Sequence, residues 1–322
     1  MLRTYFLLFV MIFFWGFSFI VVDIAMDFVT PLSIALYRLI IAAVSMIIID
    51  IFLRMKNKKK ETALTFNKTI NNGSKRNYWL YIVLASLAGV SMYLFIIYSA
   101  ISLIGPSLPV LVDCLINPIL ITLLSLAIFK EKLSKNKVIG FIIASFGAYL
   151  LITGGNIGVL QPSSPNFLGY VLALLAPLMW SFYTIAIKKV KQFDSSRTDF
   201  QNLKNISIFG GIEFFILVII TGQLNIFLNN ILNVIVFLCA LYLGLGAFVI
   251  GYYIWSYSLK KLRSSSVASF LYLQPFITLI LSIIFQRNDV IGLWNIIGGL
   301  IVMVALVIIN YKKQELTTKN SS

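Results

Sequence analysis

Ten apolar stretches, separated by short polar segments, dominate the chain. The hydrocarbon core of a bilayer is about 30 Å thick, and a helix needs roughly 20 apolar residues to cross it. Inside lipid, each backbone N–H and C=O must find its partner within the protein. We therefore expect an all-α membrane protein with ten transmembrane helices. The expected spans are Tyr5–Ile24, Pro31–Leu53, Tyr78–Ile101, Pro106–Phe129, Val138–Thr153, Phe167–Ile187, Ile206–Thr221, Ile231–Leu259, Ser265–Phe285 and Val290–Tyr311.

The composition excludes an ordinary soluble domain, because 60% of the 322 residues are hydrophobic and only 11% are charged. The net charge of +15 would indicate nucleic acid binding in a soluble protein. Here the basic residues occupy short loops between apolar stretches, where they set topology and contact anionic lipid. The bilayer is therefore the expected partner, and nucleic acid is not.

The basic residues also predict the orientation of the chain. All but two of the 26 Lys and Arg lie at the N-terminus, in every second loop, or in the C-terminal tail. The exceptions are Arg287, in a loop on the other side, and Arg38, inside a span. Cytoplasmic loops carry the excess of Lys and Arg. We expect a multi-pass protein of the cell membrane with both termini in the cytoplasm.

Catalysis is not expected, because the chain contains no histidine. This removes histidine-based acid–base chemistry and histidine metal sites. No Gly-rich phosphate loop is present for ATP. Cys114 and Cys239 both lie inside apolar stretches and are expected to pack as buried small side chains. The sequence thus predicts no catalytic residue, no metal site and no cofactor.

An internal repeat relates the two halves of the chain. Its strongest element is an amide side chain followed by proline in the middle of a span. A shift of 157 residues aligns Gly89 with Gly246, Ser99 with Ser256, and Asn117-Pro118 with Gln274-Pro275. Each half holds five spans, an odd number, so the second half should run opposite to the first. Inverted repeats of this kind are typical of secondary transporters, which bind solute where the halves meet.

The expected division of the chain follows from the repeat. It comprises a first five-helix repeat (1–153), an extracytoplasmic linker (154–166), a second five-helix repeat (167–311) and a cytoplasmic tail (312–322).

Short motifs at these positions carry a family resemblance. They are Phe14-Trp15-Gly16-Phe17-Ser18, Tyr37-Arg38-Leu39, Asn117-Pro118 followed by Phe129-Lys130-Glu131, Ile139-Gly140, and Trp180-Ser181. In this arrangement the chain resembles the EamA-type ten-helix branch of the drug/metabolite transporter superfamily. One departure is Asp289, which stands where the second repeat of the family usually carries a glutamate. The resemblance implies an exporter or permease for small metabolites, with a cavity lined by spans one, three, four, six, eight and nine.

Three ionisable residues stand out because they lie inside spans, away from the span ends: Arg38, Asp113 and Glu213. Such residues are expensive in a bilayer and are candidates for function. Arg38 and Asp113 each follow a span-opening proline by seven residues, so they should lie at similar depth. They are expected either to form a structural pair or to act as a gate or substrate clamp. Glu213 is a candidate proton carrier for coupling, or it bonds to a neighbouring helix.

The two amide–proline steps predict bends near the bilayer midplane. Pro118 and Pro275 each remove a helical hydrogen bond, which is tolerated where the backbone lines a cavity. Asn117 and Gln274 can both donate and accept hydrogen bonds. They are candidates for a polar cavity floor, with helix packing as the alternative.

Aromatic side chains supply the remaining candidates. Trp15, Tyr93, Trp180 and Tyr183 lie in the middle of their spans and could stack on a flat or cationic substrate. Simple packing is the alternative. Tyr252 belongs to a denser aromatic run that we place nearer the cytoplasmic interface.

These features together predict a secondary-active transporter or exporter of a small metabolite, such as an amino acid or related organic solute. Transport would proceed by alternating access, with proton coupling as an option. A membrane-embedded enzyme and a lipid-handling or scaffold protein are the alternatives. A monomer and a homodimer both fit the sequence.

Overall fold

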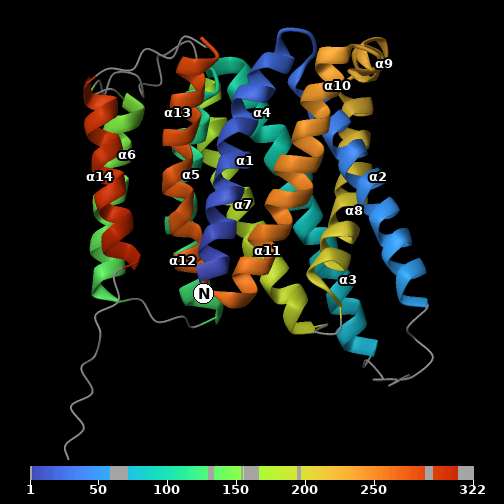
Figure 1. Ribbon diagram of the computed structural model, residues 1–322, viewed down its shortest axis with the longest axis horizontal. Coiled ribbons are helices and arrows are strands. Elements are labelled where there is room, and N and C mark those ends of the chain that lie inside the picture. The colour runs from blue at the N-terminus through green and yellow to red at the C-terminus, as the bar shows by residue number, and fades with distance from the viewer. Residues whose placement is uncertain are drawn as a thin grey trace, which may run out of the picture.

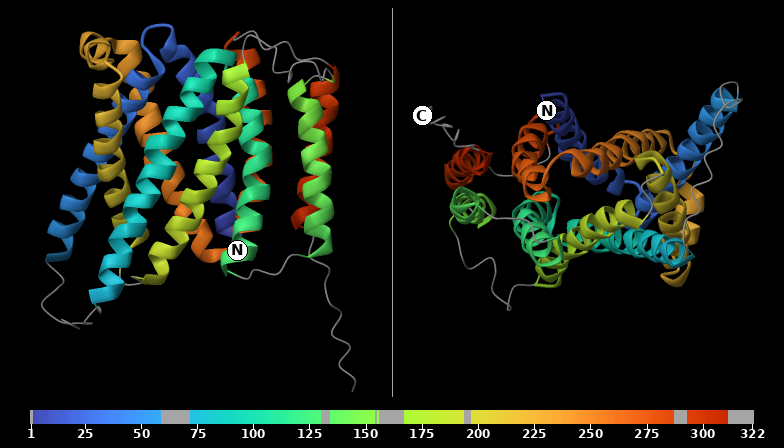
Figure 2. Two further views of the ribbon diagram at one scale, coloured as in Figure 1. Left: turned by 180° about the vertical axis from the view of Figure 1, so that it is seen from behind. Right: turned by 90° about the horizontal axis from the view of Figure 1, so that it is seen from below.

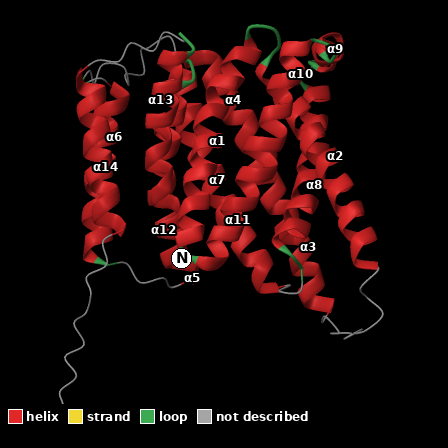
Figure 3. Ribbon diagram, viewed as in Figure 1, coloured by secondary structure: helices red, strands yellow, loops and turns green. Residues whose placement is uncertain are grey.

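The computed structural model describes residues 2–58, 72–129, 134–153, 155, 167–193, 197–286 and 293–310. Within these ranges the chain is helical and contains no strand (Figure 3). The tail 312–322, nearly all of the linker 154–166, and the residues Glu131 and Asp289 lie outside the described residues.

The helical segments follow one another along the chain with short connections. They are α1 Leu2–Met26, α2 Pro31–Lys58, α3 Asn72–Ser86, η1 Leu87–Met92, α4 Tyr93–Ile104, α5 Ser107–Phe129, α6 Lys135–Thr153, α7 Phe167–Phe193, α8 Asp199–Ile220, α9 Leu224–Asn230, α10 Val234–Leu241, η3 Tyr242–Ile250, α11 Gly251–Lys261, α12 Ser264–Ala268, η4 Ser269–Leu273, α13 Gln274–Ile284 and α14 Leu293–Asn310. Several of these segments join end to end, so α3–η1–α4, α10–η3–α11 and α12–η4–α13 each form one long rod.

In the described residues, eight helical stretches are long and apolar enough to cross a membrane, and Ile296–Ile309 in α14 is a shorter apolar helix. The protein is therefore a multi-pass membrane protein. Each of the ten expected spans overlaps one helical stretch. The helices often extend beyond the expected boundaries; α8, for example, begins at Asp199 rather than Ile206.

Local sequence signals explain where several helices begin. Pro31 opens α2, where its missing N–H has no helical partner to lose. Thr198 and Gln201 form a reciprocal capping box at the start of α8. The side chain of Asn233 accepts hydrogen bonds from the first backbone N–H groups of α10.

The rods stand side by side in one bundle (Figures 1 and 2). α6 and α14 pair at one end of the bundle, while α2 and α8 pack together at the other. Between them stand α1, α5, α7, α11 and α13. Glycines allow the α6–α14 pair to approach closely: a Cβ at Gly140 would lie 2.4 Å from Ile309 Cγ1.

Two long rods contain π-helical segments, η1 and η3. The repeat shift of 157 residues places η1 within η3, and Gly89 and Gly246 are the equivalent glycines. Each glycine contacts an aromatic ring: added Cβ atoms would lie 2.2 Å from Tyr183 and 2.8 Å from Phe14. π-Helical turns are frequent at functional sites, and here they occur at equivalent positions of the two halves.

Candidate functional site

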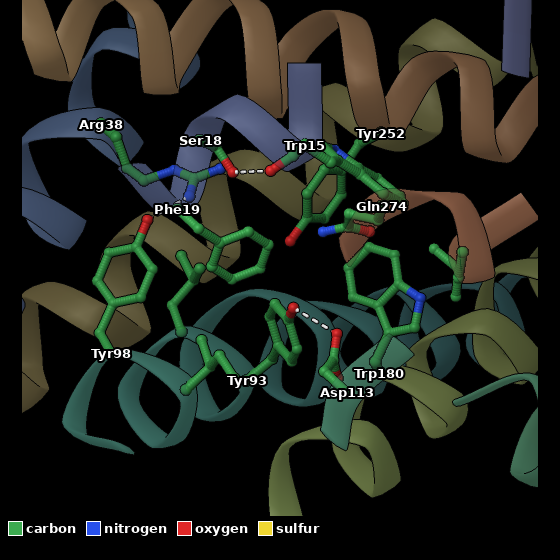
Figure 4. Close-up of a pocket in the computed structure, with 13 residues that line it drawn as sticks. Trp15, Ser18, Phe19, Arg38, Tyr93, Tyr98, Asp113, Trp180, Tyr252 and Gln274 are labelled. Carbon is green, nitrogen blue, oxygen red and sulfur yellow. Dashed lines mark hydrogen bonds between the residues drawn. The ribbon is translucent and has the colours of Figure 1, made fainter. Parts of the chain in front are cut away.

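A buried cavity of about 40 Å³ lies in the middle of the bundle (Figure 4). Helices from both halves of the chain contribute to its wall. It is lined by Trp15, Ser18, Phe19, Arg38, Tyr93, Leu94, Ile97, Tyr98, Asp113, Trp180, Tyr252, Leu271 and Gln274. A water molecule needs roughly 10–15 Å³ on this measure, so the cavity has room for a few waters and not for an organic solute.

Arg38 of α2 brings a buried positive charge to the cavity, with 4% of its surface exposed. Its Nη1 donates to Tyr98 Oη at 2.5 Å. The guanidinium carbon lies 6.0 Å from the ring centroid of Tyr98 and 5.9 Å from that of Phe248, within cation–π range. Its Nε has no hydrogen-bond partner. Buried cations are normally paired, so this guanidinium retains capacity for an anion.

Asp113 of α5 brings a negative charge to the same cavity, opposite Arg38 (Figure 4). Its Oδ2 accepts from Tyr93 Oη at 3.1 Å, and its Oδ1 accepts from Asn117 Nδ2 at 2.7 Å. Asn117 lies one helical turn further along α5, and its own Oδ1 accepts from Ser181 Oγ at 3.2 Å. The carboxylate is thus fixed by two donors while one side faces the cavity.

Aromatic rings form much of the remaining wall. Trp180 lies at the centre of this cluster. Its ring centroid is 5.2 Å from that of Trp15 and 5.1 Å from those of Tyr93 and Tyr252. Trp15 Nε1 donates to the Ala247 carbonyl of η3 at 2.8 Å. Trp180 Nε1 is buried without a partner.

Comparison with known proteins assigns the chain to a family. A model of the EamA-like transporter family matches residues 2–153 and 167–311. The chain belongs to the EamA-like transporter family. The uncharacterized transporter YyaM of Bacillus subtilis is 24% identical to it, over 91% of this chain and 89% of its own length. An uncharacterized transporter of Archaeoglobus fulgidus is 23% identical over 97% of this chain and 99% of its own length.

A crystal structure of 18% sequence identity superposes with a TM-score of 0.66 and covers 96% of both chains, so the two share a fold. Membership of the EamA-like family and the names of these relatives support a membrane transporter.

The structure brings six of the sequence-predicted residues of this EamA-family protein to the cavity wall. They are Trp15, Arg38, Tyr93, Asp113, Trp180 and Gln274. Arg38 and Asp113 are not joined by an ion pair in the described residues, since each is bonded to other groups. The direct salt bridge that equal depth allows is therefore not formed in this conformation.

Five other predicted residues lie outside the wall. Asn117 is fully buried and bonds to Asp113 behind it. Tyr183 is fully buried against Gly89. Glu213 bonds to serines of the α3–η1 rod. The prolines occupy different helical contexts: Pro118 lies inside α5, whereas Pro275 opens α13 directly after the 3₁₀ segment η4.

Sequence reasoning missed two tyrosines that line the cavity, Tyr98 and Tyr252. Tyr252 was expected nearer the cytoplasmic interface, but it faces the cavity and is 2% exposed. It directly follows η3, and each π-helical turn rotates the residues beyond it relative to an α-helical count. Tyr252 lies six residues beyond Gly246, the equivalent of Gly89, and no sequence signal identified its direction.

Proposed function

We propose that this EamA-family protein is a secondary-active transporter of small zwitterionic metabolites, namely amino acids or closely related solutes. The observation that carries the proposal is that Arg38 and Asp113 line one buried cavity without pairing to each other. A buried charge that lacks a full partner is unfavourable. An amino acid brings a carboxylate for Arg38 and an ammonium group for Asp113, so one solute complements both charges.

The aromatic wall supports the same class of solute. Trp180 lies beside Asp113 in the cavity wall, and Trp15 and Tyr252 line the same cavity (Figure 4). Indole and phenol rings attract ammonium groups through their faces. The apolar residues Phe19, Leu94 and Ile97 would contact the side chain of the solute.

The small size of the cavity supports transport by alternating access. Ligand sites are usually about 300–1,000 Å³, far above the volume found here, so the walls must separate to admit a solute. Ten membrane crossings in two inverted halves would supply this movement. In support, α1 packs on η3 while α7 packs on the equivalent η1. α1 also begins at the edge of the bundle where α7 ends (Figure 2).

The distribution of Lys and Arg supports cytoplasmic termini and a location in the cell membrane.

A ligand screen by thermal shift on the purified protein tests the proposed solute class. A solute that binds the folded state raises its apparent stability. The standard L-amino acids are compared with matched compounds that lack one charge: for phenylalanine these are phenethylamine and 3-phenylpropanoate, and for leucine isopentylamine and 4-methylpentanoate. We expect the zwitterions to stabilise the protein more than either single-charge analogue. Equal or larger shifts with the single-charge analogues would contradict the proposal.

A further inference from the structure

A second polar site lies outside the cavity, between α8 and the α3–η1 rod. Glu213 of α8 extends its carboxylate to two serines: Ser86, which directly precedes η1, and Ser91, which lies near the end of η1. Its Oε1 accepts from Ser86 Oγ at 2.8 Å, and its Oε2 accepts from Ser91 Oγ at 2.6 Å. Both serines are fully buried. A carboxylate therefore bridges the two ends of a π-helical segment in the middle of a membrane rod.

The hydrogen bonds around Glu213 leave room for one more proton. Ser86 Oγ also lies 2.9 Å from the Val83 carbonyl, and Ser91 Oγ lies 3.2 Å from the Gly210 carbonyl. Each serine hydroxyl has one proton to donate. These two protons are shared among four acceptor oxygens: the two carboxylate oxygens of Glu213 and the carbonyl oxygens of Val83 and Gly210. A protonated Glu213 would donate to one serine oxygen, and that serine would turn its own proton to the carbonyl. The site can thus satisfy Glu213 in both protonation states by rotating hydroxyl groups.

The charged and titratable groups nearby are bonded to other partners. α8 packs against α2, α3, η1 and α11. The buried ionisable side chains that these elements contribute are Tyr37, Arg38, Asp50, Tyr78 and Tyr252. Their respective partners are the Ile231 carbonyl, Tyr98, Lys204, Asn202 and the Gly89 carbonyl. No ion pair in the described part of the chain includes Glu213, and its carboxylate accepts hydrogen bonds from two hydroxyl groups.

η1 connects Glu213 to the cavity wall. On the side of α8, a Cβ at Gly210 would lie 2.5 Å from Val90 Cγ1. On the opposite side, the Gly89 carbonyl accepts from Tyr252 Oη at 2.8 Å. Tyr252 lines the cavity and stacks on Phe248 with ring centroids 4.3 Å apart. η1 is therefore hydrogen-bonded to an aromatic side chain that lines the cavity.

We propose that Glu213 binds the proton that couples transport to a pH gradient, and that η1 and Tyr252 link its protonation to the shape of the cavity. This inference rests on the proposed transport function. In each cycle Glu213 would take up one proton from one side of the membrane and release it to the other. An ionised Glu213 would accept from both serines, while a protonated one would donate to one of them and turn that serine's proton to its backbone carbonyl, which changes how α8 holds η1.

Transport assays in proteoliposomes distinguish proton coupling, measured as accumulation driven by a pH gradient, from solute movement alone, measured as counterflow. The probe is a radiolabelled mixture of L-amino acids. Glu213→Gln mimics the protonated state, so it should retain counterflow, which needs no net proton movement. Accumulation driven by a pH gradient should fall by about tenfold, within the range of typical coupling free energies. Ser91→Ala should reduce pH-driven accumulation in the same direction. Ser207→Ala is the matched control on α8, since its buried hydroxyl has no partner, and it should behave as wild type.

A spectroscopic readout tests the proton site even without transport. Infrared difference spectra between acid and alkaline pH should show a carboxyl C=O band in the wild type that is absent from Glu213→Gln. Wild-type pH-driven accumulation in Glu213→Gln, or a wild-type spectrum without the Glu213 band, would overturn the proposal. Absence of counterflow in the wild type, with the infrared band present, would instead refute the transport function and leave the proton site standing.

Discussion

Arg38 and Asp113 face each other across one buried cavity, but neither is the hydrogen-bond partner of the other (Figure 4). Arg38 donates to Tyr98, and Asp113 accepts from Tyr93 and Asn117. All three of these partners are neutral side chains. Both charges are thus held in position while their electrostatic requirement is only partly met, which is the arrangement that a zwitterionic solute complements.

Neutral substitutions of the two charged residues should reveal which end of the solute each one binds. Arg38→Gln should weaken binding of an amino acid by about 1.5–3 kcal/mol, the value of a hydrogen bond to a charged group, but should affect its decarboxylated amine little. Asp113→Asn should weaken binding of the amino acid by a similar amount, but it should change the affinity for the deaminated acid little. Isothermal titration calorimetry on the purified variants measures both.

The control for these titrations is Arg263→Gln, which removes an exposed positive charge that is not part of the cavity wall. It should bind as wild type. If Arg38→Gln binds the amino acid with unchanged affinity, the guanidinium has a structural role and the assignment of the carboxylate site is wrong.

Gly89 and Gly211 offer a matched test of the packing around η1. A Cβ at Gly89 would lie 2.2–2.5 Å from the Tyr183 side chain, whereas a Cβ at Gly211 would meet nothing within 4 Å. Gly89→Ala should destabilise the protein by about 1–3 kcal/mol, as overpacking does. Gly211→Ala should be neutral or stabilising by up to about 1 kcal/mol, since alanine is the better helix former. Thermal unfolding in detergent compares them, and equal melting temperatures would mean that η1 tolerates displacement from α7.

Much of the fold was predictable because the length of each apolar stretch and the placement of the charges between stretches are properties of whole helices. Each expected span overlaps a helix, as the lengths of the apolar stretches require. Residue identity also indicated Arg38, Asp113, Trp15 and Trp180, because charges and indoles within spans are rare or costly without a role.

The direction of each side chain was harder to predict, because it depends on rotation about the helix axis. Asn117 and Gln274 are equivalent in the repeat, yet Gln274 lines the cavity while Asn117 is buried behind Asp113. Tyr252 was misplaced because η3 precedes it and changes the helical phase. The shared hydrogen bonds of Glu213 depend on contacts between α8 and η1 that no local pattern encodes.

The two cavity tryptophans should differ in their effect on stability. Trp15 Nε1 donates to the Ala247 carbonyl, whereas Trp180 Nε1 has no partner. Replacement by phenylalanine removes similar volume from both sites. Trp15→Phe should therefore be less stable than Trp180→Phe by about 0.5–1.5 kcal/mol, the net value of one hydrogen bond. Unfolding is measured without solute, and a more stable Trp15→Phe would show that the bond to η3 contributes little.

Cysteine accessibility should establish the orientation of the two halves. Cys114 and Cys239 are buried, so they should give little background with a membrane-impermeant maleimide. Single cysteines introduced in the loop 59–71 and in the linker 154–166 are expected to react from opposite sides of the membrane. Reaction of both from the same side would contradict the inverted arrangement.

The most direct test of the account is counterflow of a radiolabelled L-amino acid mixture into proteoliposomes loaded with the same unlabelled amino acids. Wild-type protein should give transient accumulation of label, which is the signature of a carrier with alternating access. Arg38→Gln and Asp113→Asn should each reduce it by about tenfold or more, in line with the loss of a charged hydrogen bond. Accumulation at the wild-type level in both variants, or none in the wild type, would contradict the central claim that the Arg38–Asp113 cavity carries a zwitterionic solute across the membrane.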